Sequence, residues 1–161
     1  MTIDVREADL AAAADAAAIV ALVDAYAREP VGGGAPLPQE VAARLVPGLR
    51  AHATTLVLLA FVDGHAVGVA ICFAGFSTFA ARPLLNVHDL AVLPAARRRG
   101  VGRALLAAVE ARARARGCCK ITLEVLDRND PARALYASVG FAEVAAGDSA
   151  CTRFLAKPLA D

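Results

Sequence analysis

The sequence predicts one mixed α/β (α+β) domain spanning residues 1–161, and three observations lead to this prediction. The length of 161 residues suits a single domain with an ordinary core. Segments with alternating apolar side chains are interleaved with segments of helical spacing, and no internal repeat or low-complexity linker divides them. The strands cluster early in the chain, and a strand–loop–helix–strand unit follows late, which is typical of a mixed fold.

The first half of the chain predicts two strand regions separated by helices. The expected elements are a strand Ile3–Arg6, a helix with Ile19, Leu22, Val23 and Tyr26 on one face, a Gly/Pro-rich loop Pro30–Pro38, a helix Gln39–Arg50, and strands Thr54–Val62 and His65–Phe76. Asp15 is expected to be the N-cap of the first helix. The Asp63–Gly64 pair suits a type I′ turn, so the two strands should form a hairpin.

The second half predicts a helix preceded by a basic loop. The expected elements are a strand Leu84–Val92, a glycine-containing loop Ala95–Gly102, a helix Val101–Arg116, a strand Lys120–Leu126, a helix Pro131–Ser138, and a final pair of strands from Phe141 onward. Apolar Ile121, Leu123 and Val125 alternate with polar neighbours, as expected of a strand.

Composition excludes several classes of protein. Seventeen basic and sixteen acidic side chains give a formal charge of +1, which argues against nucleic-acid binding. The hydrophobic fraction of 58% reflects 40 alanines, and the longest strongly apolar run, Leu56–Val62, is far shorter than the roughly 20 residues of a spanning helix. The charged N-terminus does not resemble a signal peptide. The four cysteines lack zinc-site spacing, so we expect reduced thiols, no metal and a cytoplasmic location.

A basic, glycine-containing motif lies between the predicted strand and the long helix. Its sequence is Arg97-Arg98-Arg99-Gly100-Val101-Gly102. Glycine permits a tight turn and close approach to a ligand, and the N–H groups and dipole at a helix start favour an anion. Arginines on the loop would complete a phosphate site. A P-loop is excluded because no Gly-Lys-Ser/Thr follows.

The ordered combination of motifs resembles the GNAT superfamily of acetyl-CoA-dependent N-acetyltransferases. The Arg-x-x-Gly-x-Gly motif follows the strand His88–Val92, and the matching downstream positions are Leu123-Glu124-Val125, Asn129, Ala132, Leu135-Tyr136 and Gly140-Phe141. The resemblance covers nearly the whole chain and is densest from Leu85 to Val144. The segment Gly75–Phe79, with the strand containing Asp89, is similar to the diamine (spermidine/spermine) and thialysine acetyltransferase branch.

This resemblance implies a GNAT fold with a mostly antiparallel, twisted sheet in which two neighbouring strands splay apart. The pantetheine arm of acetyl-CoA would lie between them, paired with backbone groups of Leu90, Ala91 and Val92, and one backbone N–H would polarise the thioester carbonyl. The residues implied for the cofactor's pyrophosphate are Arg97, Arg98, Arg99, Gly100, Val101, Gly102 and Arg103. Asn129 would bind the cofactor near its sulfur. Arg98 stands where the family commonly has glycine, and it either contacts phosphate or projects into solvent.

The resemblance also implies direct attack of an amine on acetyl-CoA, for which the chain needs a proton acceptor and a proton donor. Tyr136 matches the family's general-acid tyrosine, which would protonate the leaving thiolate. An amine is mostly protonated at neutral pH, so a base must remove its proton. His88 stands where a glutamate is common in the diamine branch, and histidine suits this task. Alternation places the next residue, Asp89, on the opposite face, where it would orient the substrate. Glu124 or water are further candidates.

The acceptor is expected to be a small primary amine, bound by the loop Val31–Pro38 and the segment Phe76–Arg82. A polyamine stays open, because Asp24 and Glu29 flank this region. The alternatives are a protein or peptide acetyltransferase, which Phe76–Arg82 would obstruct, and a non-catalytic acyl-CoA-binding sensor. Nucleic acid and membranes are not expected partners. The resemblance implies a homodimer.

Overall fold

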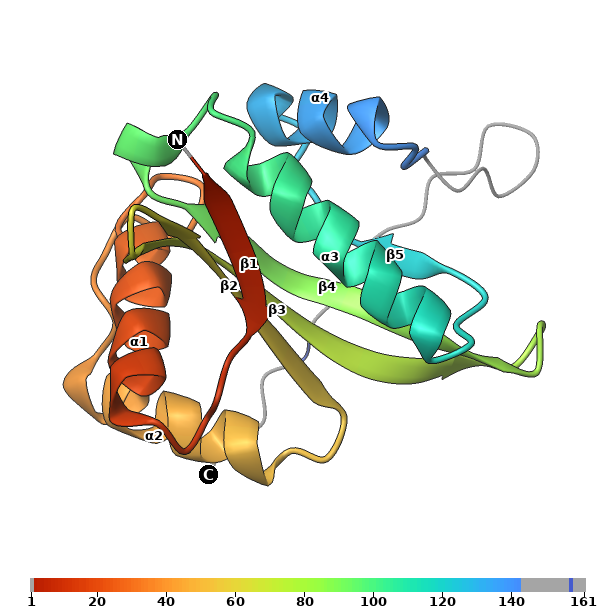
Figure 1. Cartoon of the computed structure of the whole chain (residues 1–161), viewed down its shortest axis with the longest axis horizontal. Coiled ribbons are helices and arrows are strands. Elements are labelled where there is room, and N and C mark those ends of the chain that lie inside the picture. The colour runs from red at the N-terminus through yellow and green to blue at the C-terminus, as the bar shows by residue number, and fades with distance from the viewer. Residues whose placement is uncertain (1, 143–156, 158–161) are drawn as a thin grey trace.

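The computed structural model describes residues 2–142 and residue 157 (Figure 1). The described elements, in chain order, are β1 (Ile3–Glu7), α1 (Ala13–Ala27), α2 (Gln39–Ala51), β2 (Thr55–Val62), β3 (His65–Ser77), β4 (Arg82–Val92), a 3₁₀ turn (Pro94–Ala96), α3 (Val101–Ala115), β5 (Ile121–Leu123) and α4 (Asp130–Ser138). The predicted pair of strands after Phe141 lies outside the described residues, apart from Phe141 and Ala142.

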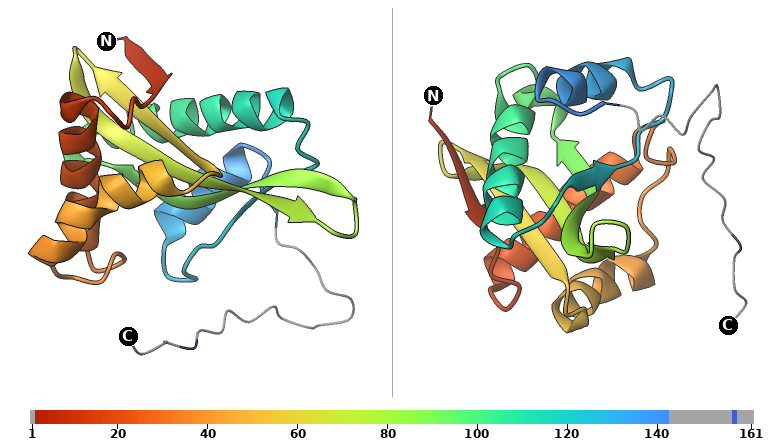
Figure 2. Two further views of the ribbon diagram at one scale, coloured as in Figure 1. Left: turned by 90° about the horizontal axis from the view of Figure 1, so that it is seen from below. Right: turned by 90° about the vertical axis from the view of Figure 1, so that its right-hand side faces the viewer.

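Within the described residues, five strands form one sheet in the order β1-β2-β3-β4-β5. All neighbours pair antiparallel except β4 and β5, which are parallel. One buried cluster, the α3-side core, joins α3 to one face of the sheet through residues such as Leu105 and Val109. The other, the α1/α2-side core, joins α1 and α2 to the opposite face through Ile19 and Leu49. Figure 2 shows the helices on the two sides of the sheet. The mixed α/β fold predicted from the sequence is confirmed.

The hairpin between β2 and β3 forms as the sequence predicts. Val62 pairs with His65 across the turn, and the two turn residues, Asp63 and Gly64, have φ angles of 49° and 79°. Both angles are positive, as a type I′ turn requires. The adjacent strand β2 is apolar on both faces because both cores cover it, with Leu58 in the α3-side core and Leu59 in the α1/α2-side core.

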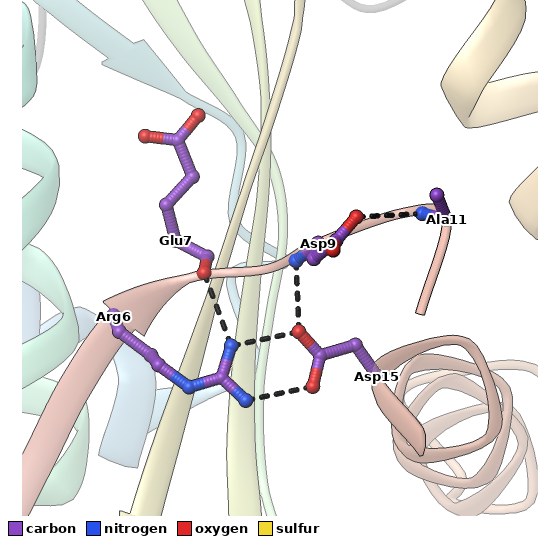
Figure 3. Close-up of polar contacts among 5 residues, drawn as sticks. All are labelled: Arg6, Glu7, Asp9, Ala11 and Asp15. Atoms are coloured by element: carbon purple, nitrogen blue, oxygen red, sulfur yellow. Dashed lines mark hydrogen bonds and ion pairs between the residues drawn. The ribbon is translucent and has the colours of Figure 1, made fainter. Parts of the chain in front are cut away.

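Asp15 is not the N-cap of α1, so that prediction was wrong. Ala12 occupies the cap position without a side-chain hydrogen bond, and Asp15 is buried in the first turn. Its two carboxylate oxygens accept hydrogen bonds from Arg6 Nη1 and Nη2, both at 2.7 Å, and Oδ2 also accepts the Asp9 N–H at 2.8 Å (Figure 3). The hydrogen bonds from Arg6 lower the pKa of Asp15. The aspartate therefore ties β1 to α1 instead of capping the helix.

Strand β4 pairs with β3 along its whole length but with β5 only at Leu85–Val87. Asn86 marks this short stretch, since its Nδ2 donates to Thr122 Oγ1 at 3.0 Å. Strand β5 ends at Leu123, earlier than the predicted Leu126, because β4 continues beyond Val87 without β5 beside it. The edge of β4 from residue 88 onward is the splayed edge, and it is open among the described residues.

Strand β4 contains a bulge where the splay begins. The pairing with β3 changes from Cys72–Val87 to Ile71–Asp89, so His88 is an additional residue without a partner. A bulge shifts the phase of a strand, which re-aims the side chains on either side of it. Apolar residues before the bulge, Leu85 and Val87, and after it, Leu90 and Val92, therefore all pack on the α3-side core.

Two further expectations concern the cysteines and the absence of a membrane span or metal site, and of the four cysteines Cys151 lies outside the described residues. Cys72 is a buried free thiol, and Cys118 and Cys119 are half-buried free thiols. Burial raises the pKa of Cys72 to about 12, as for an inert core residue. Among the described residues, no helix is both long and apolar enough to span a membrane, and no cluster of side chains could hold a metal ion.

Candidate active site

The splayed edge of β4 presents backbone groups at alternate residues. Leu93 N–H donates to Val67 O of β3 at 2.9 Å, and in an antiparallel pair every second residue faces the partner strand. The register Val69–Ala91 therefore turns the backbone groups of Ala91 toward β3. The groups of Leu90 and Val92 face the open edge. Of the three residues expected to pair with an extended ligand, these two are placed to do so.

The loop after β4 turns sharply into α3. Arg98 and Gly100 both have positive φ angles, 61° and 89°, and the left-handed conformation of Arg98 accounts for the glycine that GNAT members commonly have there. Helix α3 begins at Val101, so the first N–H groups of the helix, including those of Gly102 and Arg103, have no acceptor within it. The backbone of this turn is therefore suited to bind an anion.

Gly102 has a packing role in addition. A Cβ atom at this position would lie 2.8 Å from Leu135 Cδ2 of α4. Helix α4 therefore packs closely on the first turn of α3. The adjacent Arg103 is also directed to α4, where its Nη2 donates to Ser138 Oγ at 3.0 Å.

The three loop arginines are not equivalent. Arg97 Nε donates to Val92 O at 2.8 Å, and its Nη2 forms an ion pair with Glu29, at the end of α1. Arg98 and Arg99 are exposed, and within the described residues they form no hydrogen bond or ion pair. Two of the predicted phosphate ligands are thus free, whereas Arg97 is held in the fold. The partner Glu29, distant in sequence, was not foreseen.

His88 and Asp89 lie on the same face of β4, contrary to the alternation expected from the sequence. Asp89 pairs with Ile71, which is buried in the α1/α2-side core. The His88 ring contacts the Phe73 ring edge-on at 5.6 Å between centroids, and Phe73 packs against the same core. The bulge is the physical reason, because it removes the alternation at this point. The two titratable side chains are consequently neighbours.

The Asp89 carboxyl is half-buried. Burial raises its pKa, and the charge of His88 acts in the opposite direction. Within the described residues, Asp89 makes no hydrogen bond or ion pair through its carboxylate, so it has free acceptor capacity. Tyr26 of α1 lies close by, since its pKa is raised by burial and then by the negative charges of Asp89 and Glu29. Tyr26 was expected only as a core residue on the face of its helix.

Tyr136 lies on α4, the helix whose Leu135 packs on the first turn of α3. Its ring contacts Phe141 edge-on at 5.8 Å between centroids, and burial, followed by the charge of Tyr26, raises the pKa of Tyr136 to about 12. The phenol is therefore protonated at neutral pH, as an ordinary tyrosine also is. Tyr26 thus lies within electrostatic range of both Asp89 and Tyr136.

Asn129 and Glu124, which the sequence predicts as a cofactor ligand and a candidate base, lie at the end of a helix and beyond the end of a strand. Asn129 is the N-cap of α4, where its Oδ1 accepts the Ala132 N–H at 3.3 Å. This bond leaves the amide nitrogen of Asn129 free to donate to a ligand. Glu124 lies just beyond the end of β5 and is exposed, not within the strand as expected. The exposure of Glu124 follows from the short length of β5.

The described residues thus combine a splayed parallel strand pair, a turn suited to an anion at the next helix, the half-buried Tyr136 phenol and the free Asp89 carboxyl. Residues 19–141 match the model of the acetyltransferase (GNAT) family. The chain belongs to this family. Its members transfer the acetyl group of acetyl-CoA, and the protein is an N-acetyltransferase.

Relatives with known sequences agree with this assignment. The chain is 33% identical over 129 residues to the uncharacterised N-acetyltransferase YhfO of Bacillus subtilis (strain 168), covering 80% of this chain and 85% of the relative. It is 30% identical over 116 residues to the aminoglycoside N(6′)-acetyltransferase type 1 of Klebsiella aerogenes, covering 66% of this chain and 72% of the relative.

Solved structures share the fold. A ribosomal-protein-alanine N-acetyltransferase from Brucella melitensis biovar Abortus 2308 has a TM-score of 0.70 and 23% identity, and the match covers 95% of this chain and 100% of that one. The aminoglycoside acetyltransferase meta-AAC0020, from an uncultured soil metagenomic sample, has a TM-score of 0.75 and 18% identity, over 96% of this chain and 97% of that one.

Proposed function

We propose that the protein transfers the acetyl group of acetyl-CoA to a primary amine of a small molecule, by direct attack within a ternary complex. The observation that carries the proposal is the open edge of β4 beside a turn suited to an anion, in a fold where Tyr26 lies within electrostatic range of both Asp89 and Tyr136. In this proposal Asp89 accepts a proton and Tyr136 donates one. Direct acyl transfer to an amine needs this pair of functions.

The donor site consists of the splayed edge and the turn before α3. Leu90 and Val92 offer backbone groups to the pantetheine arm, and a backbone N–H on this edge would polarise the thioester carbonyl. Arg98, Arg99 and the first N–H groups of α3 suit the diphosphate. The donor supplies an activated acetyl group, and these residues bind and orient it.

The acceptor side must remove a proton. A primary amine with a pKa near 10 is almost fully protonated at neutral pH. Asp89 is a free carboxylate that can hold the ammonium and accept its proton, directly or through water, with His88 beside it as the second acceptor. The amine nitrogen then forms the new N–C bond while the C–S bond breaks, and Tyr136 supplies the proton that the thiolate takes.

The charge distribution favours an acceptor with few cationic groups. Asp24 already pairs with Arg28 and accepts the Leu37 N–H, and Glu29 pairs with Arg97. A polyamine would need several free carboxylates along a groove. Of Asp24, Glu29 and Asp89, Asp89 is the one carboxylate without such a partner among the described residues. We therefore prefer a small amine to the substrates of the diamine branch.

A protein or peptide acceptor is the second candidate. The β3–β4 hairpin projects from the sheet (Figure 2), with exposed Phe76 and Phe79 at its tip. Arg82, where β4 leaves this tip, is about 20 Å along the strand from His88 at about 3.4 Å per residue. We therefore infer that the tip leaves the site open, although the sequence led us to expect that it would obstruct a peptide. The fold shared with a ribosomal-protein-alanine N-acetyltransferase is compatible with this candidate.

The test is a screen for thiol release from acetyl-CoA over amino acids, aminoglycosides, polyamines and peptides with free N-termini. We expect turnover with a small primary amine, and product mass increased by one acetyl group. Turnover with peptides alone would favour the second candidate. Binding of acetyl-CoA without turnover on any amine would instead identify a non-catalytic acyl-CoA sensor. Pairing of two subunits and a cytoplasmic location remain part of the proposal, to be checked by light scattering and cell fractionation.

A further inference from the structure

The Arg97 side chain connects three parts of the molecule. Its Nε donates to Val92 O on the splayed edge at 2.8 Å, and its Nη2 pairs with Glu29 Oε1, 68 residues away in sequence. The ion pair is partly exposed, at 42% for Arg97 and 23% for Glu29. Arg97 is also the first residue of the loop whose next members, Arg98 and Arg99, carry no partner among the described residues. The loop thus has one neutralised and two free cations.

Glu29 is held in place by the backbone around it. Its carbonyl accepts the N–H of Gly32 at 2.8 Å and of Gly34 at 3.0 Å, and its own N–H donates to Tyr26 O at 3.0 Å. The carboxylate is therefore presented from a fixed position beyond the end of α1. Its position beside the guanidinium follows from this fixed turn and not from a flexible chain end.

A carboxylate and a phosphate are similar partners for arginine. Both offer negatively charged oxygens to the guanidinium in a bidentate geometry. From this geometry we propose that Glu29 is an internal competitor for Arg97, which exchanges the Glu29 carboxylate for the diphosphate of acetyl-CoA when the donor binds. The proposal rests on the donor site described above. Glu29 thereby sets the affinity for the donor without being a catalytic residue.

Glu29 could instead position Arg97 for phosphate, and this role predicts the opposite change in donor affinity when Glu29 is removed. If Glu29 served to hold Arg97 in a geometry ready for phosphate, its removal would weaken donor binding. If Glu29 acts as a competitor, its removal strengthens donor binding. A third possibility is a simple repulsion between the carboxylate and the phosphates, which would act without Arg97. The direction of the change in donor affinity, and whether it requires Arg97, therefore distinguish these three roles of Glu29.

Calorimetric titration with CoA provides the test. We expect Glu29→Gln to bind CoA about two- to fivefold tighter than the wild type, the range that corresponds to a partly exposed ion pair. Glu110→Gln is the matched control, because Glu110 pairs with Arg114 and the substitution changes the net charge equally. It lies about 15 Å along α3 from the anion-binding turn at 1.5 Å per residue, and its CoA affinity should equal that of the wild type.

Two further measurements assign the effect to Arg97 and to the diphosphate. In an Arg97→Gln background, Glu29→Gln should leave CoA affinity unchanged, and an equal gain there would overturn the exchange in favour of simple repulsion. The gain should persist with dephospho-CoA and vanish with pantetheine, which lacks the diphosphate. Weaker binding by Glu29→Gln would also overturn the proposal. A wild-type protein that binds no CoA would instead refute the donor site itself, and circular dichroism confirms that each variant is folded.

Discussion

Replacing Asp15 by asparagine tests how firmly the Arg6 ion pair joins β1 to α1. Asparagine keeps the shape of the side chain but turns one oxygen into a donor, while three donors (two of Arg6 and the Asp9 N–H) point at the two oxygens. At least one donor then meets another donor. The Asp15 side chain is 7% exposed and that of Arg6 is 45% exposed, so Arg6 can regain water after the loss.

The hydration that Arg6 regains sets the expected loss of unfolding free energy. Breaking a fully buried ion pair costs about 3–5 kcal/mol, and the exposure of Arg6 reduces this to about 2–3 kcal/mol of unfolding free energy. For a domain of this size the corresponding fall in Tm is about 5–10 °C. Urea unfolding followed by circular dichroism at neutral pH measures it. Glu110→Gln, which breaks an exposed pair on α3, should change the unfolding free energy by no more than about 0.5 kcal/mol.

The pH dependence of the stability difference between wild type and Asp15→Asn can refute the role of the ion pair. The pKa of Asp15 is lowered in the folded protein, so the stabilisation is fully present above the unfolded aspartate pKa of about 3.9 and is lost as pH falls through the lower folded value. The difference between wild type and Asp15→Asn should therefore shrink below about pH 4. A difference that is constant down to pH 3, or absent at pH 7, would show that the ion pair is not the source of stability.

Three other substitutions test the site and its turn. Tyr136→Phe should lower kcat by about 10²- to 10⁴-fold with unchanged CoA affinity, and unchanged turnover by stopped assay would remove Tyr136 from the mechanism. Asp89→Asn should lower kcat/KM at neutral pH and weaken its decline at acidic pH, because the variant lacks the carboxylate whose raised pKa makes it disappear as pH falls; activity and a pH profile identical to the wild type would contradict its role. Arg98→Gly should relieve the left-handed conformation and raise the unfolding free energy by about 1 kcal/mol, and a loss of stability in urea would contradict this reasoning.

The sequence predicts most elements because their signals are local. The Asp63–Gly64 turn fixes the β2–β3 hairpin, and the glycine at position 100 marks the start of α3. The bulge at His88 also left a signal: Leu85 and Val87 are two apart, and the next apolar residue of β4, Leu90, is three further on. This break in the period of two could have placed His88 and Asp89 on one face.

Other features depend on contacts between distant segments, which local patterns do not encode. Asp15 has the residue type and position of a helix cap, and only the approach of Arg6 from β1 decides that it serves an ion pair instead. The pairing of Glu29 with Arg97 likewise depends on how α1 packs on the sheet. The length of β5 depends on where β4 diverges from it, so alternation in Ile121–Val125 alone overestimates the strand.

The bulge in β4 separates the chemistry of the site from the packing of the core. Because His88 has no partner on β3 and the strand resumes its apolar phase at Leu90, the α3-side core receives the same kind of side chain before and after it. If the proposed function holds, substitutions at His88 change what an incoming substrate meets without altering a contact of the α3-side core, and the Phe73 ring is the neighbour that they affect. Under that proposal, His88 is the first residue to randomise when a new amine specificity is sought.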